Sequence, residues 1–345
     1  MKRIFLYDLD RTFLIFLLLS NLKKDEIFIV IDSEKKMVDD SLKSLRKYNK
    51  SKINIIVLDS NKLKENLINR IFYIKFIRKK LKGLIEENRK NKAYIYGVTQ
   101  FILAKEVFFK EKFIEIEDGM ANYTISEIEK LEEKNMNKIK ISNIIRYFLG
   151  VGSRKGRLGY AENTVKIYLT ENLCKEIPKG LESKTEIINL KRLWSEKTEE
   201  EKKIILNSFN FNSEILKKIN KDTIMLFTQP LSEDSLITEN VKLELYSKIL
   251  RKYENQSVII KPHPREKTDY SIYFSNCYVM KEKYPVEILE LVGINIKKAV
   301  TIFSSAAFGL GKDVEIDFYG TEVHPKLFER FGSQDKVMKR NAFLD

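Results

Sequence analysis

The feature that most constrains the fold is the alternation of short apolar runs with longer helical patterns along nearly the whole chain. Strands separated by crossover helices form parallel sheets with helices on both faces, so the pattern predicts an α/β protein with doubly wound sheets. Helical periodicity is clearest at residues 12–22, 62–82, 99–109, 213–219, 239–253 and 285–292. Strands are predicted at residues 4–6, 27–31, 53–57, 93–96, 113–116, 165–169, 223–227, 258–260, 278–280, 299–303 and 316–319.

The length of the chain predicts two such domains, because 345 residues exceed what one hydrophobic core usually supports. All six prolines lie in the second half, and Pro178 and Gly180 break the periodic pattern within the polar segment 172–184. We therefore expect one Rossmann-like domain over residues 1–175 and a second over residues 176–345. Ligands of open α/β sheets bind beyond the carboxyl ends of the strands, so functional side chains are expected directly after strands.

The charge balance indicates an anionic partner. The chain has 63 Lys and Arg residues against 49 Asp and Glu residues, a net charge of +14. This excess suits a phosphate-bearing substrate, a nucleic acid or an anionic membrane surface. None of the familiar nucleic-acid-binding motifs is present in the sequence, so nucleic acid is not expected. Two cysteines and two histidines argue against a disulfide scaffold and a structural zinc site.

The first residues imitate a targeting segment. A basic start at residues 1–3 precedes apolar residues, but Asp8, Asp10 and Arg11 interrupt the apolar run. The next apolar stretch, residues 13–19, is too short to span a bilayer. We therefore expect a cytoplasmic protein, with peripheral contact to the inner face of the cytoplasmic membrane as an additional interaction.

The most informative motif is KPHPR at residues 261–265, directly after a predicted strand. The prolines on either side restrict the backbone and hold the imidazole of His263 in one orientation. Imidazole can donate a hydrogen bond or a proton near neutral pH, and Lys261 and Arg265 add positive charge for a phosphate. A histidine that only caps a helix or packs in a loop is the alternative, and the setting favours the phosphate. His324 lies among polar residues before Pro325, and there we expect a structural role.

A pair of hydroxyls follows another predicted strand. Ser304 and Ser305 end the run 299–303 and precede small residues that suit the start of a helix. Helix N-termini offer unpaired amide groups and a dipole that favours anions, and the hydroxyls add two donors. An ordinary serine N-cap is the alternative. The residues alone leave both interpretations open.

Acidic and amide side chains follow three further predicted elements. The triplet Glu117-Asp118-Gly119 follows the strand at residues 113–116, where a carboxylate can act as general base on a sugar hydroxyl, although a charged turn is the alternative. Glu287 opens a predicted helix, where it can accept hydrogen bonds from ribose hydroxyls or stabilise the first helical turn. Gln229 and Asp234 follow the strand at residues 223–227.

Taken in chain order, the acidic triplet, the His-Pro turn and the Ser-Ser doublet resemble the motifs of bacterial sialyltransferases of glycosyltransferase family 52, the lipooligosaccharide sialyltransferases. The resemblance implies a GT-B architecture, in which two Rossmann-like domains face a cleft. It also implies inverting, metal-independent transfer of N-acetylneuraminate from CMP-N-acetylneuraminate to a terminal galactose of a lipooligosaccharide-type glycan. The family further suggests a homodimer. A related transferase with another nucleotide-sugar donor, such as a glucosyl donor, is the alternative.

The resemblance assigns roles to residues of this chain. Asp118 is the expected base, with Glu117 as its rival, and His263 is the expected phosphate partner or acid. No metal or other cofactor is expected. The expected donor-binding residues are Ser304 and Ser305 for the phosphate, Glu287 for the ribose, and Lys261, Gln229 and Asp234 as further contacts.

The turn after the first predicted strand departs from the family pattern. The family usually has a short turn that contains Thr-Pro, whereas this chain has Asp8-Leu9-Asp10-Arg11-Thr12. The same residues match the DxDxT loop of haloacid-dehalogenase phosphatases, in which Asp8 would be the nucleophile, Asp10 the acid/base and Mg²⁺ the cofactor. No acidic pair later in the chain fits that alternative.

A basic and aromatic segment, residues 70–83, supports a second role. Its aromatic, isoleucine and basic residues recur at helical spacing, which is typical of a helix that lies on anionic lipid. A helix that covers the sheet with a solvated lysine face is the alternative, and the sequence slightly favours it.

Overall fold

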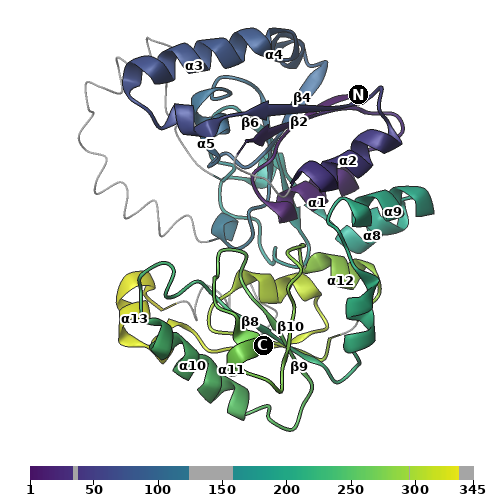
Figure 1. Ribbon diagram of the computed structural model, residues 1–345. Coiled ribbons are helices and arrows are strands. Elements are labelled where there is room, and N and C mark those ends of the chain that lie inside the picture. Colours follow the sequence, from purple (N-terminus) through teal and green to yellow (C-terminus); the bar gives the residue numbers. More distant parts are fainter. Residues whose placement is uncertain (34–37, 124–157, 295, 334–345) are drawn as a thin grey trace. The chain divides into compact units, whose positions relative to one another are not determined.

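The computed structural model describes residues 1–33, 38–123, 158–294 and 296–333. The chain forms two compact units, Met1–Asn210 and Phe211–Asp345, here called unit 1 and unit 2 (Figure 1). Every strand pairing within the described ranges is parallel, which confirms the α/β class predicted from the alternating pattern.

Unit 1 contains a seven-stranded sheet in the order β3-β2-β1-β4-β5-β6-β7. The chain starts at β1, winds outward to β3 and returns to β4 on the other side of β1. The winding therefore reverses between β1 and β4, and such a switch point is the usual ligand site of a doubly wound sheet. The strands are β1 (Lys2–Leu6), β2 (Glu26–Asp32), β3 (Ile53–Leu58), β4 (Ala93–Gly97), β5 (Phe113–Ile116), β6 (Thr164–Thr170) and β7 (Thr185–Ile188).

Helices cover both faces of this sheet because successive strand residues point to opposite faces. Ile4 and Leu6 of β1 belong to a buried cluster with Ile74 and Ile77 of α3. Phe5 points the other way and stacks on Phe16 of α1, with ring centroids 4.6 Å apart. Figure 1 shows α3 and α4 on one face and α1, α2, α8 and α9 on the other. The helices of unit 1 are α1 (Asp10–Leu19), α2 (Val38–Tyr48), α3 (Leu67–Lys80), α4 (Lys82–Arg89), α5 (Ile102–Glu106), α8 (Leu190–Ser195) and α9 (Glu199–Asn207), with 3-10 turns η1 (Ser60–Leu63) and η2 (Glu182–Lys184).

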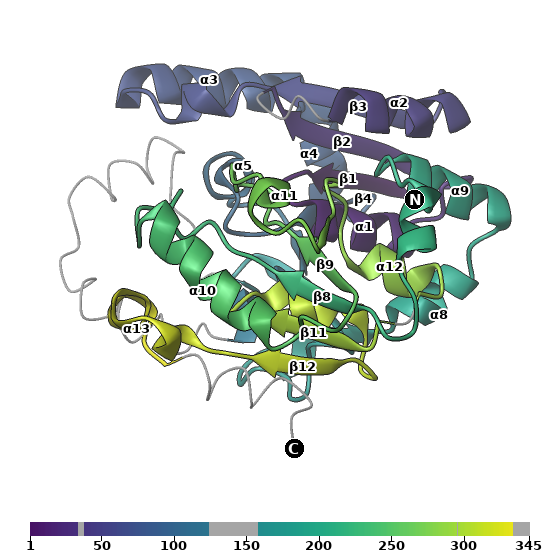
Figure 2. The ribbon, with the colours of Figure 1, turned by 60° about the horizontal axis from the view of Figure 1, so that its bottom comes forward.

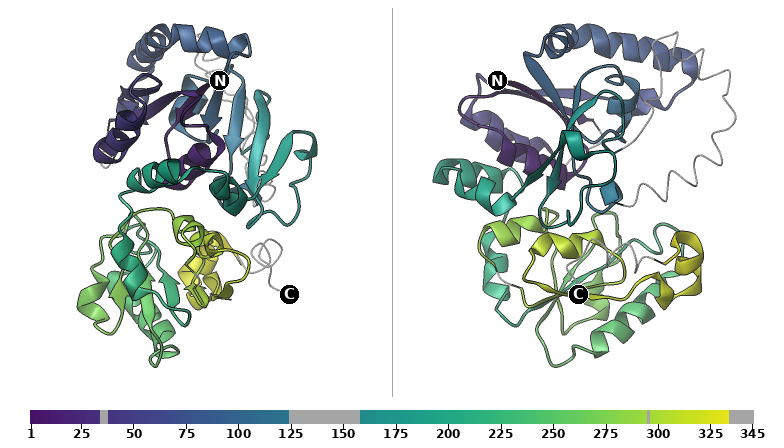
Figure 3. Two further views of the ribbon diagram at one scale, coloured as in Figure 1. Left: turned by 90° about the vertical axis from the view of Figure 1, so that its right-hand side faces the viewer. Right: turned by 180° about the vertical axis from the view of Figure 1, so that it is seen from behind.

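Unit 2 repeats the architecture with five strands in the order β10-β9-β8-β11-β12 (Figure 2). Its switch point lies between β8 and β11. Figure 3 shows α10 and α12 on opposite sides of this sheet. The strands are β8 (Ile224–Phe227), β9 (Val258–Lys261), β10 (Tyr278–Val279), β11 (Lys298–Thr301) and β12 (Glu315–Phe318). The helices are α10 (Glu239–Arg251), α11 (Tyr270–Tyr273), α12 (Glu287–Leu291) and α13 (Pro325–Phe331), with 3-10 turns η3 (Ser213–Lys218), η4 (Ser305–Leu310) and η5 (Thr321–Val323).

The boundary between the two units lies closer to the C-terminus than the sequence predicts. The predicted boundary lies between residues 175 and 176, whereas the two compact units meet after Asn210. Two contacts explain the difference: β7 pairs with β6, and the ring of Phe209 lies 5.6 Å from that of Phe13 in α1. Strand β7 escapes the sequence analysis because Glu186 and Ile187 are exposed, so no continuous apolar run marks it.

Two predicted helices are shorter than their sequence patterns. The segment predicted as one helix over residues 62–82 contains part of η1, all of α3 and the start of α4, and the segment 99–109 is helical only in α5. Within the described part of the chain, no helix is both long enough and apolar enough to span a bilayer.

Candidate active site

The acidic triplet lies directly after β5, as the sequence predicts. Gly119 has a φ of 61°, which a residue with a Cβ rarely adopts. The glycine therefore makes the turn that brings the chain away from the sheet after two consecutive acidic residues.

Glu117 is fully buried and surrounded by donors. Its carboxylate accepts hydrogen bonds from the backbone nitrogen and hydroxyl of Thr170, both at 2.7 Å, and from the Tyr123 hydroxyl at 2.6 Å. The guanidinium of Arg11 contacts the same carboxylate and donates to the Glu117 carbonyl oxygen at 2.9 Å. With both carboxylate oxygens engaged, Glu117 holds the ends of β5 and β6 together.

Asp118 has a different environment. It is partly exposed, and its backbone nitrogen donates to the side chain of Asn122 at 2.6 Å. Burial and the nearby carboxylate of Asp8 raise the pKa of Asp118 to about 6, although Arg11 opposes the shift. A carboxylate with a pKa near the working pH is well matched to general base catalysis. The base role of Asp118 stays a prediction, and its raised pKa distinguishes it from the fully engaged Glu117.

Arg11 and Thr170 are functional candidates that the sequence analysis did not identify. Arg11 contacts the hydroxyl of Thr170 at 3.1 Å as well as Glu117, so the two residues fix the carboxyl ends of the strands beside Asp118. The charged residues between β1 and α1 were a signal for Arg11, which is the second residue of α1. No sequence signal marks Thr170, which is an ordinary strand residue.

A pocket of about 370 Å³ lies at the carboxyl ends of β1 to β4 in unit 1, at the switch point. Asp32 is 8% exposed and accepts a hydrogen bond from the hydroxyl of Ser60, which is 3% exposed. The pocket thus combines carboxylate, hydroxyl, amide and ammonium groups with an aromatic surface, which is a lining suited to a polar small molecule. The pocket is lined by Asp8, Asp32, Ser60, Lys64, Gln100, Phe101 and Ile102.

In unit 2, the His-Pro turn follows β9 as predicted. The Nδ1 of His263 accepts a hydrogen bond from the backbone nitrogen of Arg265 at 3.2 Å, so the neutral ring carries its proton on Nε2. Burial and the charge of Arg265 lower the pKa of His263, which favours that neutral form. The neutral ring of His263 can therefore donate a hydrogen bond through Nε2–H, whereas an imidazolium would be needed for it to act as an acid.

Glu266 fixes this turn from inside. Its fully buried carboxylate accepts hydrogen bonds from the backbone nitrogen of His263 and the hydroxyl of Thr228, both at 2.6 Å. Thr228 directly follows β8, so Glu266 joins the loops after β8 and β9. The sequence analysis missed Glu266, although an acidic residue three positions after His263 was visible.

A buried lysine completes the same network. Lys242 of α10 is fully buried, and its Nζ lies 3.0 Å from carboxylate oxygens of Glu233 and Glu239 and 3.8 Å from Glu266. Its charge compensates carboxylates that would be costly to bury without a partner. Lys242 is therefore a positioning residue for the loops around His263.

The serine doublet lies at the switch point of unit 2, after β11. Ser304 is 6% exposed and precedes η4, and its side chain makes no capping hydrogen bond to that turn. The predicted helix after the serines is a 3-10 turn rather than an α-helix. Ser304 therefore does not act as an ordinary N-cap, and phosphate binding by its hydroxyl stays a prediction.

Glu287 lies against the segment after the serines. A Cβ at Gly309 would come within 2.8 Å of Glu287 Oε1, so the glycine leaves room for this carboxylate. Glu287 is 4% exposed at the first position of α12. The structure thus places Glu287 against Gly309 of η4, the turn that begins at Ser305.

Three predicted donor-binding residues have partners within unit 2. Lys261 donates to the carbonyl oxygen of Glu282, and Asp234 forms a bidentate pair with Arg265 at 2.6 and 3.0 Å. The backbone nitrogen of Gln229 donates to the Tyr246 hydroxyl at 2.8 Å, and its side chain is partly exposed. Arg265 and Asp234 therefore join two loops, and Gln229 is the most available of the predicted contacts.

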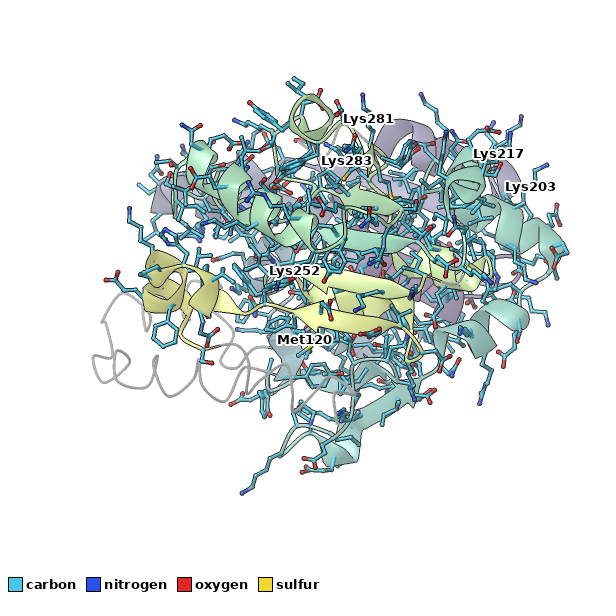
Figure 4. All side chains as sticks on the ribbon, turned by 90° about the horizontal axis from the view of Figure 1, so that it is seen from below. Met120, Lys203, Lys217, Lys252, Lys281 and Lys283 are labelled. Carbon is cyan, nitrogen blue, oxygen red and sulfur yellow. The ribbon has the colours of Figure 1, made fainter. Side chains whose placement is uncertain are left out.

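The excess positive charge is largely distributed over the surface. Exposed lysines on several elements account for much of it, among them Lys203, Lys217, Lys252, Lys281 and Lys283 (Figure 4). No group of three or more His, Cys, Asp or Glu side chains within the described ranges is arranged to hold a metal ion. Metal independence stays a prediction that requires a solution test.

Two parallel, doubly wound α/β units in one chain are the architecture of GT-B glycosyltransferases. The sequence profile of glycosyltransferase family 52 matches residues 24–327, and the chain belongs to this family. This confirms the family and the fold class expected from the three motifs.

Comparison with known proteins shows one relative in sequence and two similar folds. An uncharacterized protein of Haemophilus influenzae is 40% identical over 241 residues, which cover 69% of this chain and 72% of that protein. The GT-B domain of a sialyltransferase from Photobacterium damselae has a similar fold, with a TM-score of 0.51, 13% identity and coverage of 98% of this chain and 96% of that chain. The UGT73P12 structure from Glycyrrhiza uralensis has a TM-score of 0.50, with 10% identity and coverage of 98% and 79%.

Membership of family 52 removes the phosphatase alternative for the turn after β1. The carboxylate of Asp10 accepts a hydrogen bond from the Tyr7 hydroxyl, while Asp8 lines the pocket of unit 1. The expected structural role of His324 is confirmed, because its side chain caps α13 by accepting from the backbone nitrogen of Lys326 at 3.2 Å.

Proposed function

We propose that this glycosyltransferase is a sialyltransferase, which moves N-acetylneuraminate from CMP-N-acetylneuraminate to a terminal galactose of a lipooligosaccharide-type glycan. The observation that carries the proposal is the contrast between Glu117 and Asp118. One carboxylate is engaged by four donor groups, and the other has a pKa raised to about 6. The family and the similarity to a sialyltransferase fold support the choice of donor.

Unit 1 supplies the base and the acceptor side in this mechanism. Asp118 removes the proton from the acceptor hydroxyl as that oxygen attacks the anomeric carbon. A single displacement of this kind inverts the anomeric centre. Asp8 lines the pocket and also influences the pKa of Asp118, which links acceptor binding to the base.

The pocket of unit 1 suits a neutral galactoside. Asp8, Asp32 and Gln100 offer acceptors and donors to hydroxyls, and Phe101 offers an apolar surface to the sugar ring. Two carboxylates outnumber the single lysine, Lys64, in the lining, which disfavours an acceptor that carries its negative charge at this pocket. A galactose whose ring enters the pocket fulfils these conditions.

Unit 2 supplies the donor side. Departure of CMP increases the negative charge on its phosphate, and donors already in place lower the barrier by about 3 kcal/mol each. The Nε2–H of His263 and the hydroxyls of Ser304 and Ser305 are such donors. Glu287 binds the ribose hydroxyls, and Gln229 is a further contact. Because the pKa of His263 is lowered, the ring acts as a hydrogen-bond donor to the phosphate rather than as a full acid.

The test is a transfer assay with the full chain. CMP-N-acetylneuraminate and a lactoside are incubated with the protein in the presence of EDTA, and sialylated lactoside and free CMP are measured separately. We expect sialylated product that is insensitive to EDTA. If neither transfer nor donor hydrolysis occurs, the sialyl donor is wrong, and transfer from another nucleotide sugar would establish a sister specificity. Loss of activity in EDTA would overturn metal independence alone.

A further inference from the structure

Helix α3 carries an exposed apolar stripe. Ile68, Phe72 and Phe76 recur every four residues and therefore lie on one face of the helix. They are 67%, 67% and 56% exposed, respectively. Two phenylalanine side chains this exposed on one helix face mark an interaction surface.

The stripe is additional to the apolar face that anchors the helix. Ile74 and Ile77 are buried in the core of unit 1 and attach α3 to the sheet. On the same inner side, Arg70 pairs with Glu106 at 2.7 Å, and Arg78 donates to the carbonyl oxygen of Val107 at 3.0 Å. Among the described residues of unit 1, this packing covers the inner face of α3, and the exposed stripe lies outside it.

Lysines accompany the exposed stripe. Lys75 and Lys79 are exposed, and they lie three residues after Phe72 and Phe76, on the same side of the helix. The helix contains no acidic residue between Leu67 and Lys80. The outer face is thus both apolar and positively charged.

We propose that this outer face of α3 (Ile68, Phe72, Lys75, Phe76 and Lys79) lies on an anionic lipid bilayer. Phenylalanine and isoleucine side chains enter the boundary between headgroups and acyl chains, while lysine ammonium groups extend to the lipid phosphates. A second copy of the chain fits the surface less well. In a two-fold contact each patch meets itself, so lysines would face lysines with no carboxylate of α3 between them.

Helix α3 begins close to the pocket of unit 1. Lys64, which lines the pocket of unit 1, precedes the first residue of α3 by three positions. A bilayer beneath α3 would therefore lie close to the sugar pocket, where an acceptor carried on a lipid could enter. This inference concerns where the enzyme works and holds for any donor sugar.

The test is vesicle flotation of the full chain. Vesicles are made of phosphatidylcholine alone or of phosphatidylcholine mixed with phosphatidylglycerol. We expect binding to the mixed vesicles only, and a loss of about tenfold or more in Phe72→Ser/Phe76→Ser and in Lys75→Glu/Lys79→Glu. Because these side chains are exposed, the variants should keep the thermal midpoint of the parent protein.

Matched controls identify the surface. Ile272 of α11 is 74% exposed, and Lys203 and Lys217 are exposed on α9 and η3 (Figure 4). Ile272→Ser and Lys203→Glu/Lys217→Glu should bind vesicles as the parent does. Equal losses in these controls, equal binding to both vesicle types or no binding by the parent would overturn the proposal. A dimer that Phe72→Ser/Phe76→Ser converts to monomer, without vesicle binding by the parent, would assign the face to a second copy instead.

Discussion

The carboxylate of Glu117 lies 2.7 Å from both the backbone nitrogen and the hydroxyl of Thr170, which joins the carboxyl ends of two neighbouring strands. The next residue, Asp118, is the acidic group whose pKa is raised to about 6. Two adjacent carboxylates thus have separate tasks. One holds the site together, and the other is suited to accept a proton.

This division predicts opposite effects for two conservative variants. Asp118→Asn should reduce sialyl transfer by about a hundredfold or more, because a general base contributes that much. It should leave stability unchanged or higher at neutral pH, because burial disfavours the charge of Asp118. Glu117→Gln should lower the free energy of unfolding by about 3 kcal/mol, because it leaves the Arg11 charge without its carboxylate. Turnover and urea unfolding of both variants provide the measurements.

The reverse result would contradict the assignment. A stable Glu117→Gln protein with no turnover, beside an active Asp118→Asn protein, would make Glu117 the base. Slow hydrolysis of the donor by water should persist in Asp118→Asn, because this background reaction does not depend on activation of the acceptor hydroxyl. Persistent hydrolysis would show that the variant still binds the donor.

Asp8 should control the pH dependence of transfer. The base must be ionised, so the rate should be complete above the pKa of Asp118 and fall tenfold for each pH unit below about 6. Asp8→Asn removes a negative charge that raises this pKa, whereas the burial contribution remains. The acid limb of kcat/KM should therefore move to lower pH in Asp8→Asn. An unchanged acid limb would show that the titrating group is not Asp118.

The strand pattern predicted most of the fold because buried parallel strands are continuous apolar runs, whatever side chains come after them. Most of the candidate site residues could be placed after strands for the same reason. The pairing of distant polar groups could not be predicted from the sequence. The sequence around Glu117 is that of a charged turn, and only the structure shows that Arg11 and Thr170 surround its carboxylate. Likewise, the sequence around Glu287 is that of a helix start, and only the structure shows Gly309 beside it.

The edge strand β7 shows the other limit of sequence analysis. Its exposed residues carry no apolar run, so only its pairing with β6 identifies it as part of unit 1. The phosphatase-like turn was misleading for a related reason. Spacing alone cannot show that Asp10 is engaged by Tyr7 while Asp8 reaches a pocket.

His263 should act as a hydrogen-bond donor to the donor phosphate. His263→Ala should lower kcat by about a hundredfold, whereas His263→Gln, whose amide can also donate, should recover part of the rate. His324→Ala is the matched control, since that histidine caps α13, and it should retain normal turnover. Equal rates for the alanine and glutamine variants would instead support a proton-transfer role for the imidazole.

Lys242 should stabilise unit 2. Lys242→Met removes the charge that three carboxylates surround, so the free energy of unfolding should fall by about 3 kcal/mol. Lys248→Met, an exposed position on the same helix, should change it by less than about 0.5 kcal/mol. Similar urea midpoints for the two variants would show that the buried lysine contributes no more than a surface charge.

Gly309 should be required for donor binding through Glu287. In Gly309→Ala the new Cβ would approach Glu287 Oε1 to 2.8 Å, so the carboxylate must shift from its position against η4. Because the ribose does not react, the loss should affect ground state and transition state alike and raise KM for the donor about tenfold with little change in kcat. Gly83→Ala is the control, since a Cβ there meets no atom within 4 Å, and its kinetics should match the parent. Steady-state kinetics with varied CMP-N-acetylneuraminate make the comparison, and an unchanged KM in Gly309→Ala would remove Glu287 from the donor site.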